Sequence, residues 1–161
     1  MPGKPEYHTT IADFIMDIPL FSELKSHELG IVADHMNFFE IEEGEVLFKE
    51  GDQGDYVCFV LQGGLDVVKE TGSSGETVTI ATITRKRSIG EMSVIDNTTR
   101  SATAVARSKT SLVSLPRKSF DTILDRHPKT GIKILKGIAR LMSMNMRKTS
   151  SRLADYMLPD C

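Results

Sequence analysis

The chain has 161 residues, 40% of them apolar and 26% charged, with a net charge of −2 and two cysteines. This composition predicts one soluble globular domain and excludes disordered, fibrous and disulfide-scaffold classes. The charge is uneven: residues 1–60 carry −10 and residues 61–161 carry +8. An anionic ligand or partner is therefore expected at the second half of the chain, unless these bases only lie on solvent-exposed helix faces.

No apolar run approaches the roughly 20 residues that span a bilayer, and the first thirty residues lack a signal-peptide pattern. We therefore expect a cytoplasmic protein without membrane contact. Residues 1–9 hold two prolines and no periodicity, which predicts a flexible leader. From Thr10 to about Met36 apolar residues recur every three or four positions around Pro19, which predicts short helices.

Between Phe39 and Leu115 short runs of Val, Ile, Phe and Thr alternate with glycine-bearing turns, as in antiparallel sandwiches and barrels. The predicted strands are Val46–Lys49, Val57–Leu61, Leu65–Lys69, Val78–Ile83, Ala102–Ala106 and Ser111–Leu115. The predicted fold is mainly β with flanking helices: a double-stranded β-helix, or jelly-roll-like β-roll, with N-terminal helices and a long C-terminal helix. The roll and its N-terminal helices occupy residues 10–126.

Residues 127–161 are predicted to form the long helix and a tail, after a short helix around Phe120–Asp125. The long helix opens at His127-Pro128 and continues to about Met157, because proline suits a first helical turn. Apolar or small polar residues recur on it at spacings of three and four: Leu135, Ile138, Met142, Asn145 and Thr149. This seam packs either on the roll or on a second copy, in a homodimer whose register Asn145 fixes.

The segment from Ser88 to Ala104 combines an acid and a base among apolar residues between two predicted strands. We expect one or two helical turns over Gly90–Ile95, with free N–H groups near Gly90 that attract anions. Arg100, nine residues after Glu91, offers a fork of donors that suits a phosphate. From the residues alone, the two charges either pair with each other or bind a ligand that carries an anion and hydroxyls, such as a cyclic sugar phosphate.

The stretch from Gly90 to Thr103 resembles the phosphate-binding cassette of the cyclic-nucleotide-binding domain family, which includes bacterial catabolite activator protein and the regulatory subunits of cAMP-dependent protein kinase. Gly90-Glu91 and the spacing to Arg100 match the family, and so do the small residues of Ser101-Ala102-Thr103. The likeness extends upstream to Gly44–Asp55 and Phe59–Gly63 and covers roughly residues 12–150.

The resemblance implies that Glu91 accepts a hydrogen bond from the ribose 2′-hydroxyl and that Arg100 pairs with the cyclic phosphate. Further contacts to the same groups are implied for Gly90, Met92, Ser101 and Ala102. It also implies that the long helix moves on ligand binding. Three residues fall where that helix would cover the base, as a lid or alternatively as seam and surface residues: Asn145, Met146 and Arg147.

This sequence departs from the family pattern before and within the cassette. Relatives usually have a glycine-rich turn and two aromatic or apolar residues before Gly-Glu, where this sequence has Thr84-Arg85-Lys86-Arg87-Ser88-Ile89. The three bases of this stretch serve the ligand, a partner or only the solvent. Thr99 replaces a frequent proline, which leaves the loop without a fixed φ. Nothing up to Cys161 resembles a recognition helix, so we expect no direct sequence-specific DNA binding.

The leading hypothesis is therefore a non-enzymatic regulatory domain that senses a cyclic nucleotide, cAMP in preference to cGMP, and acts on an effector protein. The alternative is a ligand-independent interaction domain with a degenerate pocket, because residues 129–157 hold seven bases and one acid. A cupin-type metalloenzyme is disfavoured, since the four histidines do not cluster on predicted strands. We expect no cofactor, no metal and no catalytic residues.

Overall fold

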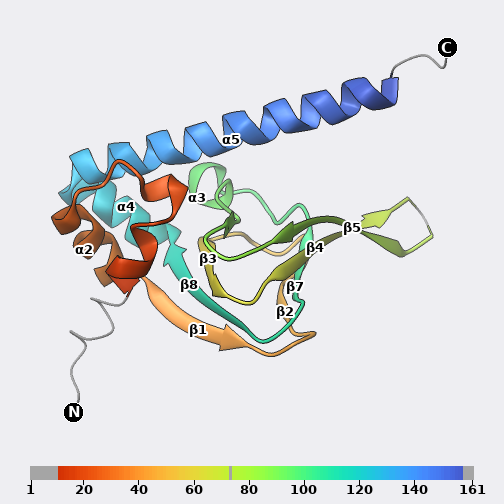
Figure 1. The fold of residues 1–161 in the computed structure, drawn as a ribbon, viewed down its shortest axis with the longest axis horizontal. Coiled ribbons are helices and arrows are strands. Elements are labelled where there is room, and N and C mark those ends of the chain that lie inside the picture. The colour runs from red at the N-terminus through yellow and green to blue at the C-terminus, as the bar shows by residue number, and fades with distance from the viewer. Residues whose placement is uncertain (1–10, 73, 158–161) are drawn as a thin grey trace.

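Two four-stranded antiparallel sheets form the body of the molecule in the computed structural model, which describes residues 11–72 and 74–157 (Figure 1). The first sheet has the order β1 (Asn37–Ile41), β8 (Thr110–Pro116), β3 (Tyr56–Gln62) and β6 (Ser88–Ile89). The second has the order β2 (Val46–Phe48), β7 (Thr103–Ala106), β4 (Leu65–Thr71) and β5 (Glu76–Ile83). The predicted β-roll with flanking helices is thereby confirmed.

All six predicted strands are present, with ends within two residues of the prediction, but β1 and β6 were not predicted. The edge strand β1 begins with two exposed residues, the second of which, Phe38, is apolar and 46% exposed, so its sequence lacks a clear two-residue alternation. β6 has only two residues, which pair with Cys58 and Phe59 of β3. A strand of this length leaves no periodic signal in a sequence.

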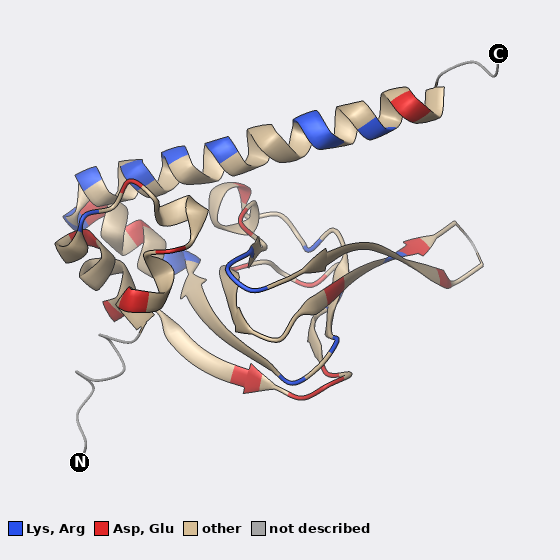
Figure 2. Cartoon of the chain, viewed as in Figure 1, with Lys and Arg blue, Asp and Glu red and all other residues tan. Residues whose placement is uncertain are grey.

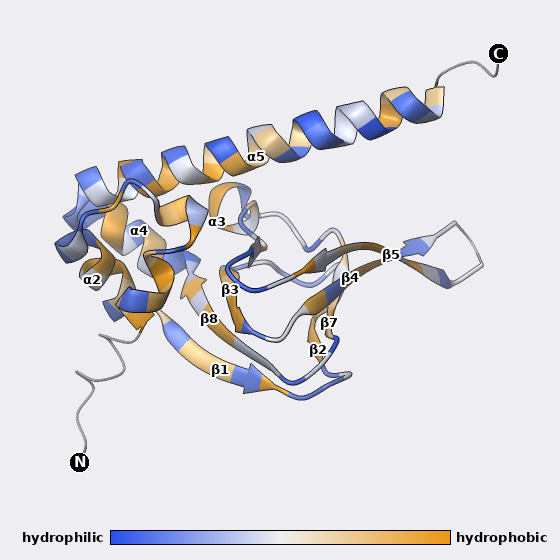
Figure 3. Cartoon of the chain, in the orientation of Figure 1, coloured by the Kyte–Doolittle hydropathy of each residue, from blue (hydrophilic) through white to orange (hydrophobic). Residues whose placement is uncertain are grey.

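Strand β3 is buried on both faces, which explains its uninterrupted apolar sequence (Figure 3). Val57 and Phe59 pack with the helices, whereas Cys58 and Val60 pack in a second cluster that includes residues of both sheets. Burial raises the pKa of the Cys58 thiol to about 12, so it stays neutral. Cys58 is thus the small buried hydrophobe that its sequence context predicts.

The helices gather on one side of the roll: a first helix over residues 11–15, η1 (Pro19–Phe21), α2 (Ser26–Asp34), α4 (Arg117–Arg126) and α5 (Pro128–Met157) (Figure 1). The predicted bounds of α5 are confirmed. The predicted leader, residues 1–9, and the tail from residue 158 lie outside the described residues.

The seam of α5 divides into a packed part and an exposed part. Ile138 is buried, and Leu135 and Met142 pack against the core formed with the other helices. Asn145 and Thr149 are exposed, as are all residues from 143 to 157. The first half of the seam therefore packs within this chain, and a homodimer through the second half stays a prediction.

Buried Glu28 joins α2 to the start of α5. Its carboxylate accepts hydrogen bonds from Thr130 Oγ1 at 3.0 Å, from Lys133 Nζ at 2.6 Å and from the backbone N–H of Lys25 at 3.0 Å. Burial opposes ionisation of Glu28, but these donors outweigh it and lower the pKa to about 2. The first turns of α5 are thus fixed to the N-terminal helices.

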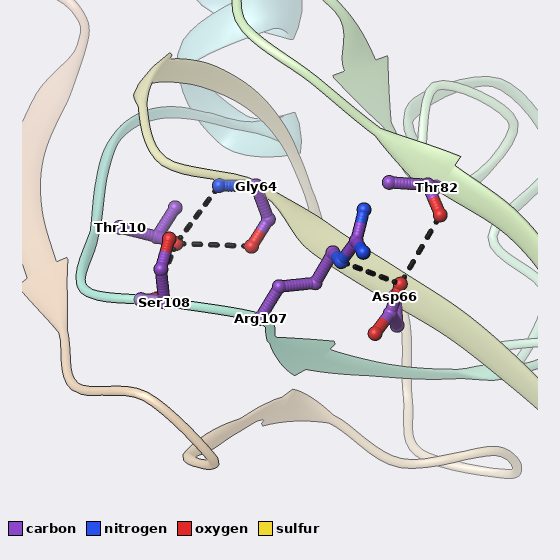
Figure 4. Close-up of polar contacts among 6 residues, drawn as sticks. All are labelled: Gly64, Asp66, Thr82, Arg107, Ser108 and Thr110. Carbon is purple, nitrogen blue, oxygen red and sulfur yellow. Dashed lines mark hydrogen bonds and ion pairs between the residues drawn. The ribbon is translucent and has the colours of Figure 1, made fainter.

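Side chains at the end of β7 connect it to β4 and β5 (Figure 4). Arg107 Nε lies 3.3 Å from Asp66 Oδ1, which also accepts a hydrogen bond from Thr82 Oγ1 at 3.1 Å. Nearby, Thr110 Oγ1 donates to the carbonyl of Gly64 at 3.0 Å. The polar groups of this turn region therefore obtain partners from the chain itself.

Candidate functional site

The segment between β6 and β7 turns sharply at Gly90. Its φ is +84°, and a Cβ there would lie 2.2 Å from Arg100 Nη1 and 3.2 Å from the carbonyl oxygen of Tyr56. Only glycine fits this position without strain and displacement of the arginine.

The short helix in this segment, α3 (Ser93–Asp96), begins three residues later than predicted. Gly90 cannot start it, because its left-handed conformation is not helical. The prediction of free helical N–H groups near Gly90 is therefore wrong. Asn97 ends α3 with a φ of 58°, and its side-chain oxygen accepts hydrogen bonds from Gln53 Nε2 at 2.9 Å and from Arg117 Nη1.

The backbone of Arg100 is fixed to the loop between β2 and β3. Its N–H donates to the carbonyl of Asp52 at 2.7 Å, and its carbonyl accepts from the N–H of Gly51 at 2.8 Å. An isolated β-bridge also joins Thr99, where the family often has proline, to Gln53. Backbone contacts thus hold the position where this sequence lacks proline.

The guanidinium of Arg100 is buried, with 4% of the residue exposed, and has no acidic partner among the described residues. Nη1 donates to Ser93 Oγ at 3.0 Å and Nη2 to the carbonyl of Tyr56 at 2.7 Å. The central carbon lies 4.1 Å and 4.6 Å from the ring centroids of Phe48 and Tyr56. Nε is buried without a hydrogen-bond partner. A buried charge held in this way favours a bound anion.

Glu91 is partly buried beside the arginine, and within residues 11–72 and 74–157 its one side-chain hydrogen-bond partner is Ser88, whose Oγ donates to Oε2 at 3.4 Å. Burial raises the pKa of Glu91, and the hydrogen bonds from its own backbone and Ser88 and the charge of Arg100 offset this only in part. Within the described part of the chain no ion pair joins Glu91 to Arg100. The alternative of a structural ion pair is therefore wrong for this structure.

The two charged residues line one pocket of about 190 Å³. All six residues predicted to contact the ligand line it: Gly90, Glu91, Met92, Arg100, Ser101 and Ala102. The structure adds six that the sequence analysis did not assign to the site: Phe48, Val67, Ile89, Ser93, Thr98 and Thr99. Their contacts with a ligand stay a prediction, but their convergence on one pocket is a property of the fold.

The three predicted lid residues do not reach this pocket. Asn145, Met146 and Arg147 lie on the exposed half of α5, and the side chain of Met146 is 69% exposed. Their role as a lid therefore stays a prediction about a different position of α5.

A further cation lies beside the cassette, since Lys69 Nζ donates to the carbonyl of Ser101 at 2.8 Å.

No three His, Cys, Asp or Glu side chains among residues 11–72 and 74–157 are grouped so that they could hold a metal ion. In the same residues, no helix is long and apolar enough to cross a membrane.

A family model described as the cyclic nucleotide-binding domain matches residues 38–127. The fold and the charged pocket agree with this match, and the chain belongs to the cyclic nucleotide-binding domain family. A crystal structure of a cyclic nucleotide-binding domain from Methylobacillus flagellatus is 30% identical, with a TM-score of 0.83, and the match covers 98% of this chain and 88% of that one.

Curated relatives are much longer than this chain. A lysophospholipase of Neurospora crassa is 36% identical over 107 residues, which are 66% of this chain and 7% of the relative. The cAMP-dependent protein kinase regulatory subunit of Yarrowia lipolytica is 29% identical over 124 residues, which are 77% of this chain and 32% of the relative. The likeness thus concerns one domain of these proteins.

Proposed function

We propose that this regulatory domain binds cAMP in preference to cGMP at the pocket around Arg100. The observation that carries the proposal is the buried Arg100 guanidinium, next to the carboxylate of Glu91. In the described part of the chain Nε of Arg100 has no hydrogen-bond partner and Glu91 has no cation within ion-pair distance. The cyclic phosphate would supply the missing anion. The ribose hydroxyl would donate to Glu91, as the family resemblance implies.

The preference for cAMP rests on the prevalence of cAMP-binding members in the family and agrees with the name of the kinase regulatory subunit above. Ser101 does not decide between the two bases. Titration calorimetry with each nucleotide on the same protein measures the preference directly. Tighter binding of cGMP would reverse this part of the proposal.

The binding proposal is tested by replacing Arg100 and, in a separate control variant, Arg107. Arg100→Ala removes a charge-assisted contact worth about 1.5–3 kcal/mol per hydrogen bond, so cAMP affinity should fall by about 100-fold or more. Arg107→Ala, outside the pocket, should leave affinity unchanged. Retained binding in folded Arg100→Ala would place the phosphate elsewhere.

We further propose that ligand binding reaches an effector through movement of α5 in a cytoplasmic signalling protein. The exposed half of α5, residues 143–157, has little to hold it against the roll, whereas Glu28 fixes the start of the helix. Hydrogen exchange on saturation with cAMP should change within or next to the exposed half and not around Thr130. Unchanged exchange along all of α5, in a sample that binds cAMP, would contradict this transmission.

The second candidate is a ligand-independent interaction domain, favoured by the basic, exposed surface of α5. Figure 2 shows Lys and Arg residues distributed along most of the length of α5. Absence of cAMP and cGMP binding at millimolar ligand, in a folded sample, would favour this candidate.

A further inference from the structure

A groove of about 460 Å³ lies outside the nucleotide pocket, between α5, the segment from Asp17 to Ser22 and the turn between β5 and β6. Its apolar lining includes Ile18, Leu141 and Met144. Ile18 is 2% exposed and Met144 is 55% exposed, so apolar surface continues from the core out to solvent. Such a groove suits an apolar side chain of a partner.

The rim of the groove is predominantly basic. Lys86 and Arg87 come from the turn whose three consecutive bases the nucleotide site does not use, and Arg140 comes from α5. Arg87 forms no side-chain hydrogen bond or ion pair with the part of the chain that the structure describes. The turn is the continuous blue stretch of loop on the α5 side of the roll in Figure 2.

The other two rim cations have exposed partners that a ligand can replace. Lys86 Nζ lies 3.6 Å from Asp17 Oδ2, and Arg140 Nη1 lies 2.8 Å from Glu23 Oε1. The side chains of both pairs are between 42% and 55% exposed, and such pairs contribute only about 0–1 kcal/mol each. Carboxylates of a ligand can therefore replace Asp17 and Glu23 as partners of these cations at little cost in free energy.

The backbone of the turn that carries these bases is held in place by β3. Lys86 has a φ of 70°, a left-handed conformation that costs a residue with a side chain about 1–2 kcal/mol. The N–H of Lys86 donates to the carbonyl of Val60 in β3 at 2.9 Å, and the N–H of Val60 donates to the carbonyl of Arg87 at 3.1 Å. A glycine would adopt this turn without strain, so Lys86 stands here against the local backbone preference. The turn therefore presents its bases from a fixed stretch of backbone.

We propose that this groove binds an acidic peptide segment of a partner protein. One apolar side chain of the segment enters between Ile18 and Met144, and flanking carboxylates pair with Arg87 and Arg140. The apolar contact supplies most of the affinity, and the charges select the partner.

The test starts from a displayed library of random twelve-residue peptides, selected on the full chain without nucleotide. The selected peptides should carry Asp or Glu on both sides of a large apolar residue. Their affinity, measured by fluorescence anisotropy, should fall at least 10-fold for Arg87→Glu and for Met144→Glu. Arg152→Glu and Met157→Glu make the same chemical changes on the exposed half of α5, outside this groove, and should leave affinity within twofold.

Three results would overturn the proposal: no enriched peptide, a consensus without acids, or equal losses for the control variants. Self-association of the wild-type chain that Met144→Glu abolishes, seen in sedimentation velocity, would instead identify a second copy as the occupant.

Ser88 lines this groove and also donates to Glu91 of the nucleotide pocket at 3.4 Å. We therefore expect saturating cAMP to change peptide affinity at least threefold, and an unchanged affinity would remove this coupling. That measurement rests on the proposed function, whereas peptide binding without nucleotide does not, so the two failures are distinguishable.

Discussion

Arg100 and Arg107 lie on either side of the four-residue strand β7, yet the chain treats their charges in opposite ways. Arg107 is exposed, and its Nε is 3.3 Å from a carboxylate oxygen of Asp66 (Figure 4). Arg100 is buried, and its Nε has no partner. Arg107 thus obtains its acid from the chain, whereas under the proposed function the acid for Arg100 comes from the ligand.

The largest effect is expected from crowding Arg100 by way of Gly90. Gly90→Ala places a methyl group where Nη1 lies and should reduce cAMP affinity by about 100-fold or more, because the guanidinium must move. Titration calorimetry measures this loss.

Gly44→Ala is the matched control, since Gly44 has nearly the same φ, +83°, but no atom within 4 Å of the added Cβ. It should cost about 1 kcal/mol of folding free energy from backbone strain alone and leave affinity unchanged. Equal affinities for both variants would show that the position of Arg100 does not govern binding.

Glu28 extends the comparison to a buried acid whose partners all come from the chain. Glu28→Gln should lower the free energy of unfolding by roughly 2 kcal/mol, because Lys133 and Thr130 lose a charged acceptor. Glu23→Gln, which breaks an exposed pair with Arg140, should cost less than about 0.5 kcal/mol. Urea unfolding curves at neutral pH distinguish the two.

The lowered pKa of Glu28 also sets the direction of a pH effect. Its folded pKa of about 2 is below the ordinary 4.5, so its stabilising contribution is complete above pH 4.5 and is lost as the pH falls towards 2. The wild type should therefore lose more stability than Glu28→Gln over this range. Parallel curves for the two proteins would contradict the pKa assigned to Glu28.

Glu91 should give a smaller effect that depends on one ligand hydroxyl. Glu91→Ala should weaken cAMP binding by about 10-fold, the value of one charge-assisted hydrogen bond. 2′-Deoxy-cAMP should bind the wild type about 10-fold more weakly than cAMP does. The Glu91→Ala variant should bind 2′-deoxy-cAMP and cAMP with equal affinity. If the two losses add in full, Glu91 does not contact that hydroxyl.

The smallest effect is expected at Arg107. Arg107→Ala should reduce the free energy of unfolding by about 0.5 kcal/mol, because the pair with Asp66 is partly exposed. A double-mutant cycle with Asp66→Ala measures the coupling energy. A value above about 2 kcal/mol would weaken the contrast between a surface pair and the buried Arg100.

The sequence predicts the strands and α5 well because alternation, glycine turns and three-to-four spacing are local properties. It predicts Glu91 and Arg100 for the same reason, since both lie in one contiguous segment. Phe48 is different: it meets Arg100 only after β2 comes to lie beside this segment, and no local pattern marks it. Ser93 belongs to the segment, but its hydrogen bond with Arg100 depends on how the segment folds. The start of α3 was misplaced because the left-handed φ of Gly90 depends on packing against Tyr56.

The most direct test of the central claim follows the Arg100 Nε–H group by ¹⁵N NMR during titration with cAMP. If the phosphate supplies the missing acceptor, this resonance should shift downfield and become protected from exchange with water, while that of Arg107 stays in place. Saturation with cAMP that leaves the Arg100 resonance unmoved would contradict the assignment of the phosphate to this buried charge.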